Sequence, residues 1–267
     1  MSVAQRARWK TWAAISAALV GLTVPALTAT PAGATTGAYD STYYKNAVGK
    51  TGTGLKSSLH TIISGNTRKI SYDAVWNALK TTDQDPANSA NVLLLYSGTS
   101  RSKTLSGGDL GDWNREHVWA QSHGGFGTSA GPGTDLHHLR AADVQVNSIR
   151  GNKDFDYGGS AVSGAPGSYT DSNSFEPRDA DKGDVARMVL YMAVRYEGDD
   201  GFPDLEANDS TTNGSVPFLG RISVLKQWNE QDPPSAFEER RNDIIFNTYQ
   251  GNRNPFIDHP EWVEAIW

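Results

Sequence analysis

Cysteine is absent from this sequence of 267 residues. Disulfides are therefore excluded, and the fold must be held by packing, with or without help from bound ions. The length allows one large domain or two small ones, which is enough to bury a core without covalent cross-links. Aromatic side chains are a source of core anchors, and we expect this role for five of the eight tryptophans: Trp76, Trp119, Trp228, Trp262 and Trp267.

Long apolar runs are also missing beyond the first part of the chain. The amino terminus has three basic residues up to Lys10, then an uncharged and mostly apolar stretch at residues 11–23, then a small-x-small site ending at Ala34. This pattern is typical of a secretory signal peptide. A retained membrane anchor is the alternative, but the run is shorter than the roughly 20 residues that a spanning helix needs. We predict a signal peptide at residues 1–34 and a secreted, soluble protein without membrane attachment after cleavage.

An excess of basic residues is missing too. The chain has 24 Lys and Arg against 30 Asp and Glu, and without the three basic residues of the predicted signal peptide the balance is 21 against 30, a net charge of −9. Nucleic-acid binders usually carry a basic face, because phosphate contacts dominate their affinity. An acidic protein can still turn over nucleic acid where a local cleft and a metal ion offset the repulsion. Its binding is then expected to be weak and sensitive to salt.

The hydrophobic pattern predicts helices around a small β element, which is an α+β fold. Helices are expected at residues 51–80 (two of them), 182–197, 216–228 and 235–249, the last with a capping box formed by Ser235 and Glu238. Extended segments are expected at residues 91–96, 114–119 and 136–139. A helix at residues 141–150 should follow them and end at Gly151. The glycine- and serine-rich residues 158–174 are expected to form a loop.

The chemistry-bearing residues concentrate between residues 112 and 156, which hold four of the six histidines. Hydrolysis of a phosphodiester needs a base for water, and a neutral histidine such as His117 suits that task near neutral pH. It also needs charge on the leaving oxygen to be offset, which a divalent cation can do. Oxygen ligands such as the Glu116 carboxylate and the Asn147 carbonyl favour magnesium or manganese over zinc.

The spacing of these residues sets conditions on the backbone. Asn147 and Arg150 share one face of a helix, so Asn147 could hold the metal while Arg150 reaches the phosphate or orders a neighbouring acid. Glu116 and His117 are adjacent, and a regular strand would point them to opposite faces. Both can serve one site only at a strand end, a bulge or a bend.

Three segments, in the same order, resemble the bacterial endonuclease I family: WNREHVWAQSHG from Trp113, TDLHHLRAADVQVNSIRGNKDF from Thr134, and QGNRNPFIDHPEW from Gln250. With further matches at residues 182–187 and 191–192, the resemblance runs from about Val92 to Trp262. Members of this family are secreted or periplasmic non-specific nucleases with a ββα-metal (His-Me finger) core. The resemblance implies such a core, embedded in surrounding helices, in a single catalytic domain over residues 35–267.

The resemblance also implies roles for individual residues. His117 is the expected general base, and Glu116 and Asn147 are the expected ligands of one Mg²⁺ ion, with Mn²⁺ or Ca²⁺ as possible substitutes. Arg150 is the expected catalytic support of the phosphate. Substrate contacts are expected from Asn114, Gln121 and Arg140. DNA and RNA are the expected substrates, the products carry 5′-phosphate ends, and the enzyme is expected to be a monomer.

The sequence departs from the family in ways that affect the site. Some relatives have several disulfides, so this chain resembles the cysteine-free branch. The loop between His117 and Asp135 carries no arginine or lysine. An arginine that some relatives place there is therefore not matched, and the residue that binds the phosphate stays open.

Other functions are compatible with parts of the sequence. A zinc hydrolase could use the histidine cluster, although no His-Glu-x-x-His motif is present. A secreted module that binds cell-wall glycan through surface tryptophans would leave the Glu, His, Asn and Arg cluster without a purpose. For His123, His137 and His138 we expect structural roles, and Arg150 fits a structural ion pair as well as a phosphate contact.

Overall fold

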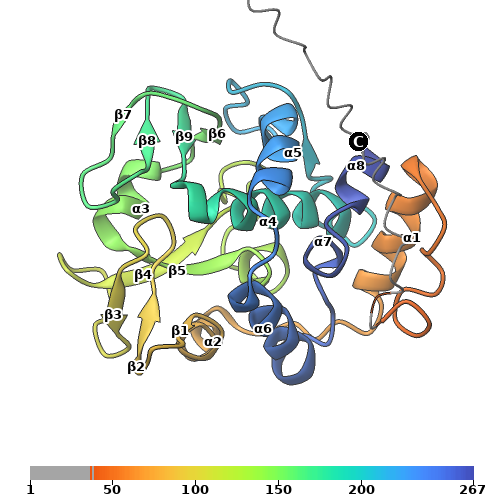
Figure 1. Cartoon of the computed structure of the whole chain (residues 1–267), viewed down its shortest axis with the longest axis horizontal. Helices are drawn as coiled ribbons and strands as arrows, with labels where there is room; N and C mark the ends of the chain where they lie inside the picture. The colour runs from red at the N-terminus through yellow and green to blue at the C-terminus, as the bar shows by residue number, and fades with distance from the viewer. Residues whose placement is uncertain (1–36, 38) are drawn as a thin grey trace, which may run out of the picture. The chain divides into compact units, whose positions relative to one another are not determined.

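A single buried helix, α4 (Lys182–Arg195), is the axis around which the other elements pack. All of its 14 residues are buried. Figure 1 shows α4 at the centre, and it contacts α1 (Gly52–Ser64), α5 (Ile222–Gln231) and α7 (Pro255–Asp258). The computed structural model describes residue 37 and residues 39–267, so the predicted signal peptide lies outside the described residues. The helix predicted at residues 182–197 is confirmed within two residues of its end.

The other helices follow local capping signals. In α2 (Tyr72–Thr82) the side chain of Ser71 accepts a hydrogen bond from the Ala74 amide. The predicted capping box is present at α6 (Ala236–Ile244), which continues as a π-helical turn at Ile245–Tyr249 and is followed later by α8 (Trp262–Ile266). The helix predicted at residues 216–228 begins only at Ile222. The reason is that β11 (Phe218–Leu219) pairs in parallel with β10 (Glu206–Ala207). No helix in the described part of the chain has both the length and the apolar character needed to cross a membrane.

Two small sheets flank the centre. The first has the order β1 (Gln84–Asp85), β2 (Asn88–Leu93) and β3 (Ser100–Ser102), so the strand predicted at residues 91–96 lies three residues earlier. The second has the order β6 (Asp154–Phe155), β9 (Ser174–Glu176), β8 (Tyr169–Thr170) and β7 (Ser160–Ala161). The prediction of a loop over residues 158–174 is therefore wrong in part, because β7 and β8 pair across it as a hairpin.

The central element is an antiparallel pair of strands followed directly by a helix. β4 (Trp113–His117) pairs with β5 (Leu139–Asp143), with Trp113 opposite Asp143 and His117 opposite Leu139. The second strand was predicted at residues 136–139, which is wrong by three to four residues. The backbone of Asp135 accepts from the amides of His138 and Leu139, and this turn delays the strand. Helices that surround this pair and the two small sheets, with strands and helices mixed along the chain, confirm the α+β class.

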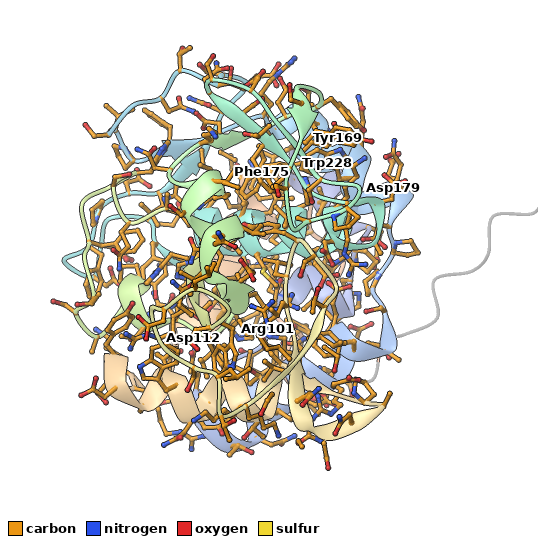
Figure 2. The ribbon with its side chains drawn as sticks, turned by 90° about the vertical axis from the view of Figure 1, so that its left-hand side faces the viewer. Arg101, Asp112, Tyr169, Phe175, Asp179 and Trp228 are labelled. Carbon is orange, nitrogen blue, oxygen red and sulfur yellow. The ribbon has the colours of Figure 1, made fainter. Side chains whose placement is uncertain are left out.

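The helix after β5 has well-defined ends. α3 (Val144–Arg150) begins at Val144, three residues later than predicted, because the Asp143 side chain caps the amides of Gln145 and Val146. It ends, as predicted, at Gly151, whose φ of 60° favours glycine. Arg101 on β3 donates hydrogen bonds to the Asp143 side chain, at 2.6 Å, and to the Asp112 carbonyl, at 2.9 Å. Figure 2 labels Arg101 and Asp112 side by side. Arg101 thus ties the start of α3 to β3 and to the residue that precedes β4.

Tryptophans anchor the core, as the sequence indicates. Trp119 and Trp228 are fully buried and Trp262 is 9% exposed, while Trp76 and Trp267 are partly buried against the core. The Trp228 ring packs edge-on to the rings of Phe155 and Tyr157. Trp228 and Phe175 of β9, both labelled in Figure 2, belong to the same cluster of buried hydrophobic residues. Aromatic packing therefore holds this sheet to α5 in a chain without disulfides.

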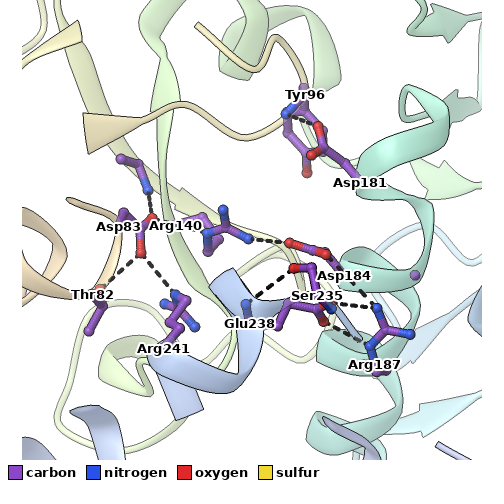
Figure 3. Close-up of polar contacts among 12 residues, drawn as sticks. Thr82, Asp83, Tyr96, Arg140, Asp181, Asp184, Arg187, Ser235, Glu238 and Arg241 are labelled. Atoms are coloured by element: carbon purple, nitrogen blue, oxygen red, sulfur yellow. Dashed lines mark hydrogen bonds and ion pairs between the residues drawn. The ribbon is translucent and has the colours of Figure 1, made fainter. Parts of the chain in front are cut away.

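A buried network of charges connects the helices to the central strands (Figure 3). Asp83 accepts from Arg241 at 2.8 Å, from Arg140 at 3.0 Å, and from the Ala141 amide at 2.8 Å. Arg140 also donates to Asp184 on α4, at 3.0 Å. Burial alone would raise the pKa of Asp83, but the two guanidiniums outweigh it and lower that pKa. The carboxylate is therefore held charged, as a bridge between α2, β5 and α6.

This network makes Asp83 a stability determinant. Replacing it (Asp83→Asn) removes the charge that compensates two buried guanidiniums, and we expect the free energy of unfolding to fall by about 3–5 kcal/mol. Urea denaturation followed by circular dichroism measures this change. The exposed Asp109 provides the control, and Asp109→Asn should change the free energy by no more than about 0.5 kcal/mol. Equal stability of the two variants would contradict the assigned role of the network.

Candidate active site

An open cleft of about 360 Å³ lies at the end of β4. Four of the predicted site residues line it: Glu116, His117, Gln121 and Asn147. β4 ends at His117, so the adjacent residues Glu116 and His117 both reach one cleft, as their predicted roles require. Their other contacts diverge: Glu116 reaches Tyr96 and Arg150, whereas His117 faces Gly133 and Tyr72.

The hydrogen bonds of His117 define which ring nitrogen is basic. Its Nε2 lies 3.0 Å from the carbonyl oxygen of Gly133, which can only accept, so Nε2 carries the proton in this contact. The Gln121 amide nitrogen, which can only donate, lies 3.1 Å from the same Nε2 and also donates to the Gly127 carbonyl. We assign the proton to Nε2 because this is the shorter contact and Gly133 offers only an acceptor, whereas the Gln121 amide already has Gly127 as its acceptor. The lone pair is then on Nδ1. Burial, with the charge of His138 next, lowers the pKa of His117 to about 3, so the ring is neutral at physiological pH.

Glu116 and Asn147 each present an oxygen on the wall of the cleft. Glu116 accepts at Oε1 from the Tyr96 hydroxyl at 2.7 Å and lies 3.2 Å from Arg150, while Oε2 makes no hydrogen bond to another described side chain. Asn147 donates its amide nitrogen to Asn114 Oδ1 at 2.7 Å. This contact orients the side-chain amide and leaves its oxygen, Asn147 Oδ1, without a hydrogen bond among the described residues. Two oxygen ligands suited to a small divalent cation are therefore available together.

Two predicted arginines are not in the cleft. Arg150 is fully buried, and it donates to the carbonyls of His117 (2.9 Å) and Val118 beside its pair with Glu116. Arg140 is 3% exposed and bound between Asp83 and Asp184. Neither guanidinium lines the cleft, so neither is placed to contact a phosphate beside His117. Asn114 does not line it either and reaches the site only through Asn147.

The remaining histidines of this region are bound to the protein itself, which agrees with their expected structural roles. His123 contacts the carbonyls of Phe218 and Asn152 through its two ring nitrogens. His137 contacts the Asn252 carbonyl, and His138 bridges the Pro132 carbonyl and the Trp119 amide. No three His, Asp or Glu side chains of the described residues are grouped to hold a metal ion. The histidines thus form no ligand set of the kind that the zinc hydrolase alternative requires.

Sequence reasoning missed two residues that line the cleft, Tyr72 and Arg115. Arg115 stands next to Glu116 in the motif, but its neighbours were unknown. Its guanidinium carbon lies 3.5 Å from the centre of the Tyr72 ring and 4.2 Å from that of Trp76. Both rings come from α2, and no local pattern links that helix to β4.

Comparisons with known proteins show the family to which this chain is similar. The family model described as Endonuclease I matches residues 51–261. An extracellular ribonuclease of Bacillus amyloliquefaciens is 68% identical over 226 residues, which is 85% of this chain and 78% of that protein. An extracellular ribonuclease of Bacillus subtilis (strain 168) is 67% identical over the same shares of the two chains.

Buried neutral histidines make stability depend on pH. Burial lowers the pKa of His138 to about 4, against about 6.5 when the chain is unfolded, so the unfolded state binds more protons between these values. The stability that this ring contributes is complete above pH 6.5 and is lost as the pH falls towards 4. When the pH is lowered from 7 to 4.5, the free energy of unfolding of the wild type should fall by about 2 kcal/mol more than that of His138→Gln. Urea denaturation at the two pH values measures both changes.

The control for this prediction is a variant that is destabilised without a titrating group. Val146→Ala shortens a buried side chain, and it should lower stability by a similar amount at both pH values. A pH dependence of His138→Gln equal to that of the wild type would show that His138 is not held neutral.

Proposed function

This chain belongs to the endonuclease I family, and we propose that it is a secreted nuclease that hydrolyses phosphodiester bonds in RNA and DNA. One observation carries the proposal. A neutral histidine with its Nε2 proton held by a backbone carbonyl shares a cleft with two oxygen ligands, from Glu116 and Asn147. This combination supplies a base and a place for a cation, which are the two requirements of phosphodiester hydrolysis.

The proposed reaction begins with His117 as general base. Nδ1 takes a proton from a water molecule as its oxygen bonds to phosphorus, and the bond from phosphorus to the 3′-oxygen breaks. The leaving 3′-oxygen takes a proton from a solvent water molecule, and the histidine returns its own proton to solvent, so the products are a 5′-phosphate and a 3′-hydroxyl. The Gly133 carbonyl holds the proton on Nε2, so the ring stays in the tautomer with a basic Nδ1.

The cleft residues also fit a divalent cation. Glu116 and Asn147 would hold it, and their hard oxygen atoms suit Mg²⁺, with Mn²⁺ or Ca²⁺ as possible substitutes. A bound cation would offset the negative charge that develops on the leaving oxygen. Around it, Tyr96 and Arg150 fix the Glu116 carboxylate and Asn114 fixes the Asn147 amide, so both ligands are oriented in advance.

The choice of substrate follows from this chemistry. Attack by water needs no 2′-hydroxyl, so the same residues can act on RNA and on DNA. The two Bacillus relatives are named ribonucleases, which supports RNA as a substrate here. Their names also describe extracellular proteins, which supports export directed by the predicted signal peptide at residues 1–34.

The base assignment is tested by His117→Ala. We expect kcat on single-stranded RNA and DNA to fall by about 10²- to 10⁴-fold, because water then loses its proton acceptor. Mn²⁺ binding, followed by electron paramagnetic resonance, should be unchanged. His60→Ala is the control and should keep wild-type turnover, because His60 contacts the Val194 carbonyl and Asp199 and does not line the cleft. Retained turnover in His117→Ala would refute the assignment.

The cation site is tested separately by Glu116→Gln, which keeps the hydrogen-bonding shape but removes the charge. Mn²⁺ affinity should fall by at least 10-fold, and excess chelator should abolish wild-type cleavage. Cleavage that persists in chelator, or unchanged Mn²⁺ affinity in the variant, would rule out this ligand pair.

A further inference from the structure

Besides a metal ion, binding of the substrate phosphate calls for a positively charged side chain in the cleft. The two arginines expected from the sequence, Arg140 and Arg150, do not supply it. Arg140 and Arg150 are buried, and each is paired with carboxylates or carbonyls of the protein. The loop between His117 and Asp135 carries no basic residue. The phosphate-binding residue must therefore come from another part of the cleft wall.

We propose that Arg115 is the residue that binds the phosphate of the substrate, held in place for this by Tyr72 and Trp76. This inference rests on the proposed nuclease function. Among the residues lining the cleft, Arg115 carries the only guanidinium and Lys is absent. A guanidinium fork matches two phosphate oxygens, which makes it better suited than a point charge to orient the group.

The guanidinium of Arg115 is fixed before substrate binds. It stacks over the Tyr72 ring and contacts the Trp76 ring, with 3.5 Å and 4.2 Å to the ring centres. Its Nη1 donates to the Tyr72 carbonyl at 2.8 Å. Three contacts with α2 thus hold a long side chain that would otherwise lose rotamer entropy on binding. Tyr72 and Trp76 are positioning residues in this arrangement.

Arg115 has no ion pair within the described part of the protein, although the Asp73 carboxylate acts on its charge from a greater distance. No carboxylate of residues 37 and 39–267 forms an ion pair with it, and its Nε and Nη2 make no hydrogen bond to those residues. This differs from Arg101, Arg140, Arg150, Arg187, Arg241 and Arg253, which all have carboxylate partners. Among the described residues, the contacts of its guanidinium are the Tyr72 and Trp76 rings and the Tyr72 carbonyl, which leave its charge available to an anion in the cleft. In an acidic protein, this leaves a local positive site in the cleft.

The place of Arg115 on β4 relates it to the base. Arg115 and His117 are two residues apart on one strand, so their side chains point to the same side, roughly 7 Å apart along the strand. The Tyr72 ring lies beside both, 5.8 Å from the His117 ring. A phosphate bound by Arg115 would therefore lie on the side of β4 where His117 can present a water molecule to it.

Binding of a fluorescent 12-nucleotide DNA single strand tests this directly. His117→Ala is the background, so that Mg²⁺ can be present without cleavage, and anisotropy gives the affinity over a range of salt concentrations. Arg115→Gln in this background should weaken binding by about 10- to 100-fold. It should also lower the slope of log affinity against log salt by about 0.7, the value for one lost phosphate contact.

Arg240 offers a matched control for the loss of one positive charge. It is also half-buried, donates to backbone carbonyls of Thr81 and Thr82, has no ion pair with a described residue, and lies outside the cleft. Arg240→Gln should change the affinity by less than about twofold and the salt slope by less than about 0.2, relative to the His117→Ala background. Arg115→Lys should keep the salt slope but bind several-fold more weakly, because it lacks the fork.

The activity measurement uses the same substitutions with His117 intact. Arg115→Gln should lower kcat/KM on RNA and DNA by about 10²- to 10³-fold, and Arg240→Gln should not. If Arg115→Gln fails to fold, as judged by circular dichroism, Arg115→Lys decides the matter: wild-type affinity and kcat/KM in that variant would overturn the proposal.

The outcomes separate this inference from the proposed function. One outcome is that the wild type cleaves while Arg115→Gln matches Arg240→Gln in affinity, salt slope and kcat/KM. This result would overturn the role of Arg115 and leave the nuclease function intact. If the wild type is inactive but the His117→Ala variant still binds the strand through Arg115, only the nuclease function is overturned. Absence of any binding by the background would overturn the phosphate site.

Discussion

The arrangement of the cleft depends on one buried side chain, Arg150. From the last turn of α3 it donates to the backbone carbonyls of His117 and Val118 and pairs with Glu116. These contacts fix the end of β4, where the strand stops and the two adjacent side chains reach one cleft. Because the two terminal nitrogens of this fully buried guanidinium are held by the carbonyls at the end of β4, the position of α3 and the exit of β4 are coupled. Asp143 and Arg101 set the other end of the same helix.

The protein is acidic, and its buried arginines are compensated: Arg140 and Arg241 by Asp83, Arg187 by Glu238. Compensation on this scale fixes the helices around α4 without adding a net positive charge. If Arg115 binds the phosphate as proposed, the cleft would attract a polyanionic substrate to an otherwise acidic protein. Such an arrangement favours weak, salt-sensitive binding, which suits an enzyme that must release its product.

The sequence predicted what local patterns determine and missed what distant contacts determine. The capping box at Ser235 and the end of α3 at Gly151 follow from neighbouring residues, and the structure has both. The extended segment predicted at residues 114–119 is present as β4, which begins one residue earlier and ends two residues earlier, at His117. The environments of the arginines do not follow in this way. Arg140 meets Asp83 and Asp184, which are 57 and 44 residues away, and Arg115 meets Tyr72, which is 43 residues away. Without those partners, an arginine in the motif could not be distinguished from one in the core.

The central claim is that water activated by His117 attacks phosphorus directly. The most direct measurement is cleavage of matched RNA and DNA oligonucleotides in ¹⁸O-labelled water, with mass spectrometry of the products. The account predicts 5′-phosphate ends that carry one ¹⁸O atom, 3′-hydroxyl ends, and the same result for both sugars. A 2′,3′-cyclic phosphate from RNA, with no cleavage of DNA, would show attack by the 2′-hydroxyl and contradict the account.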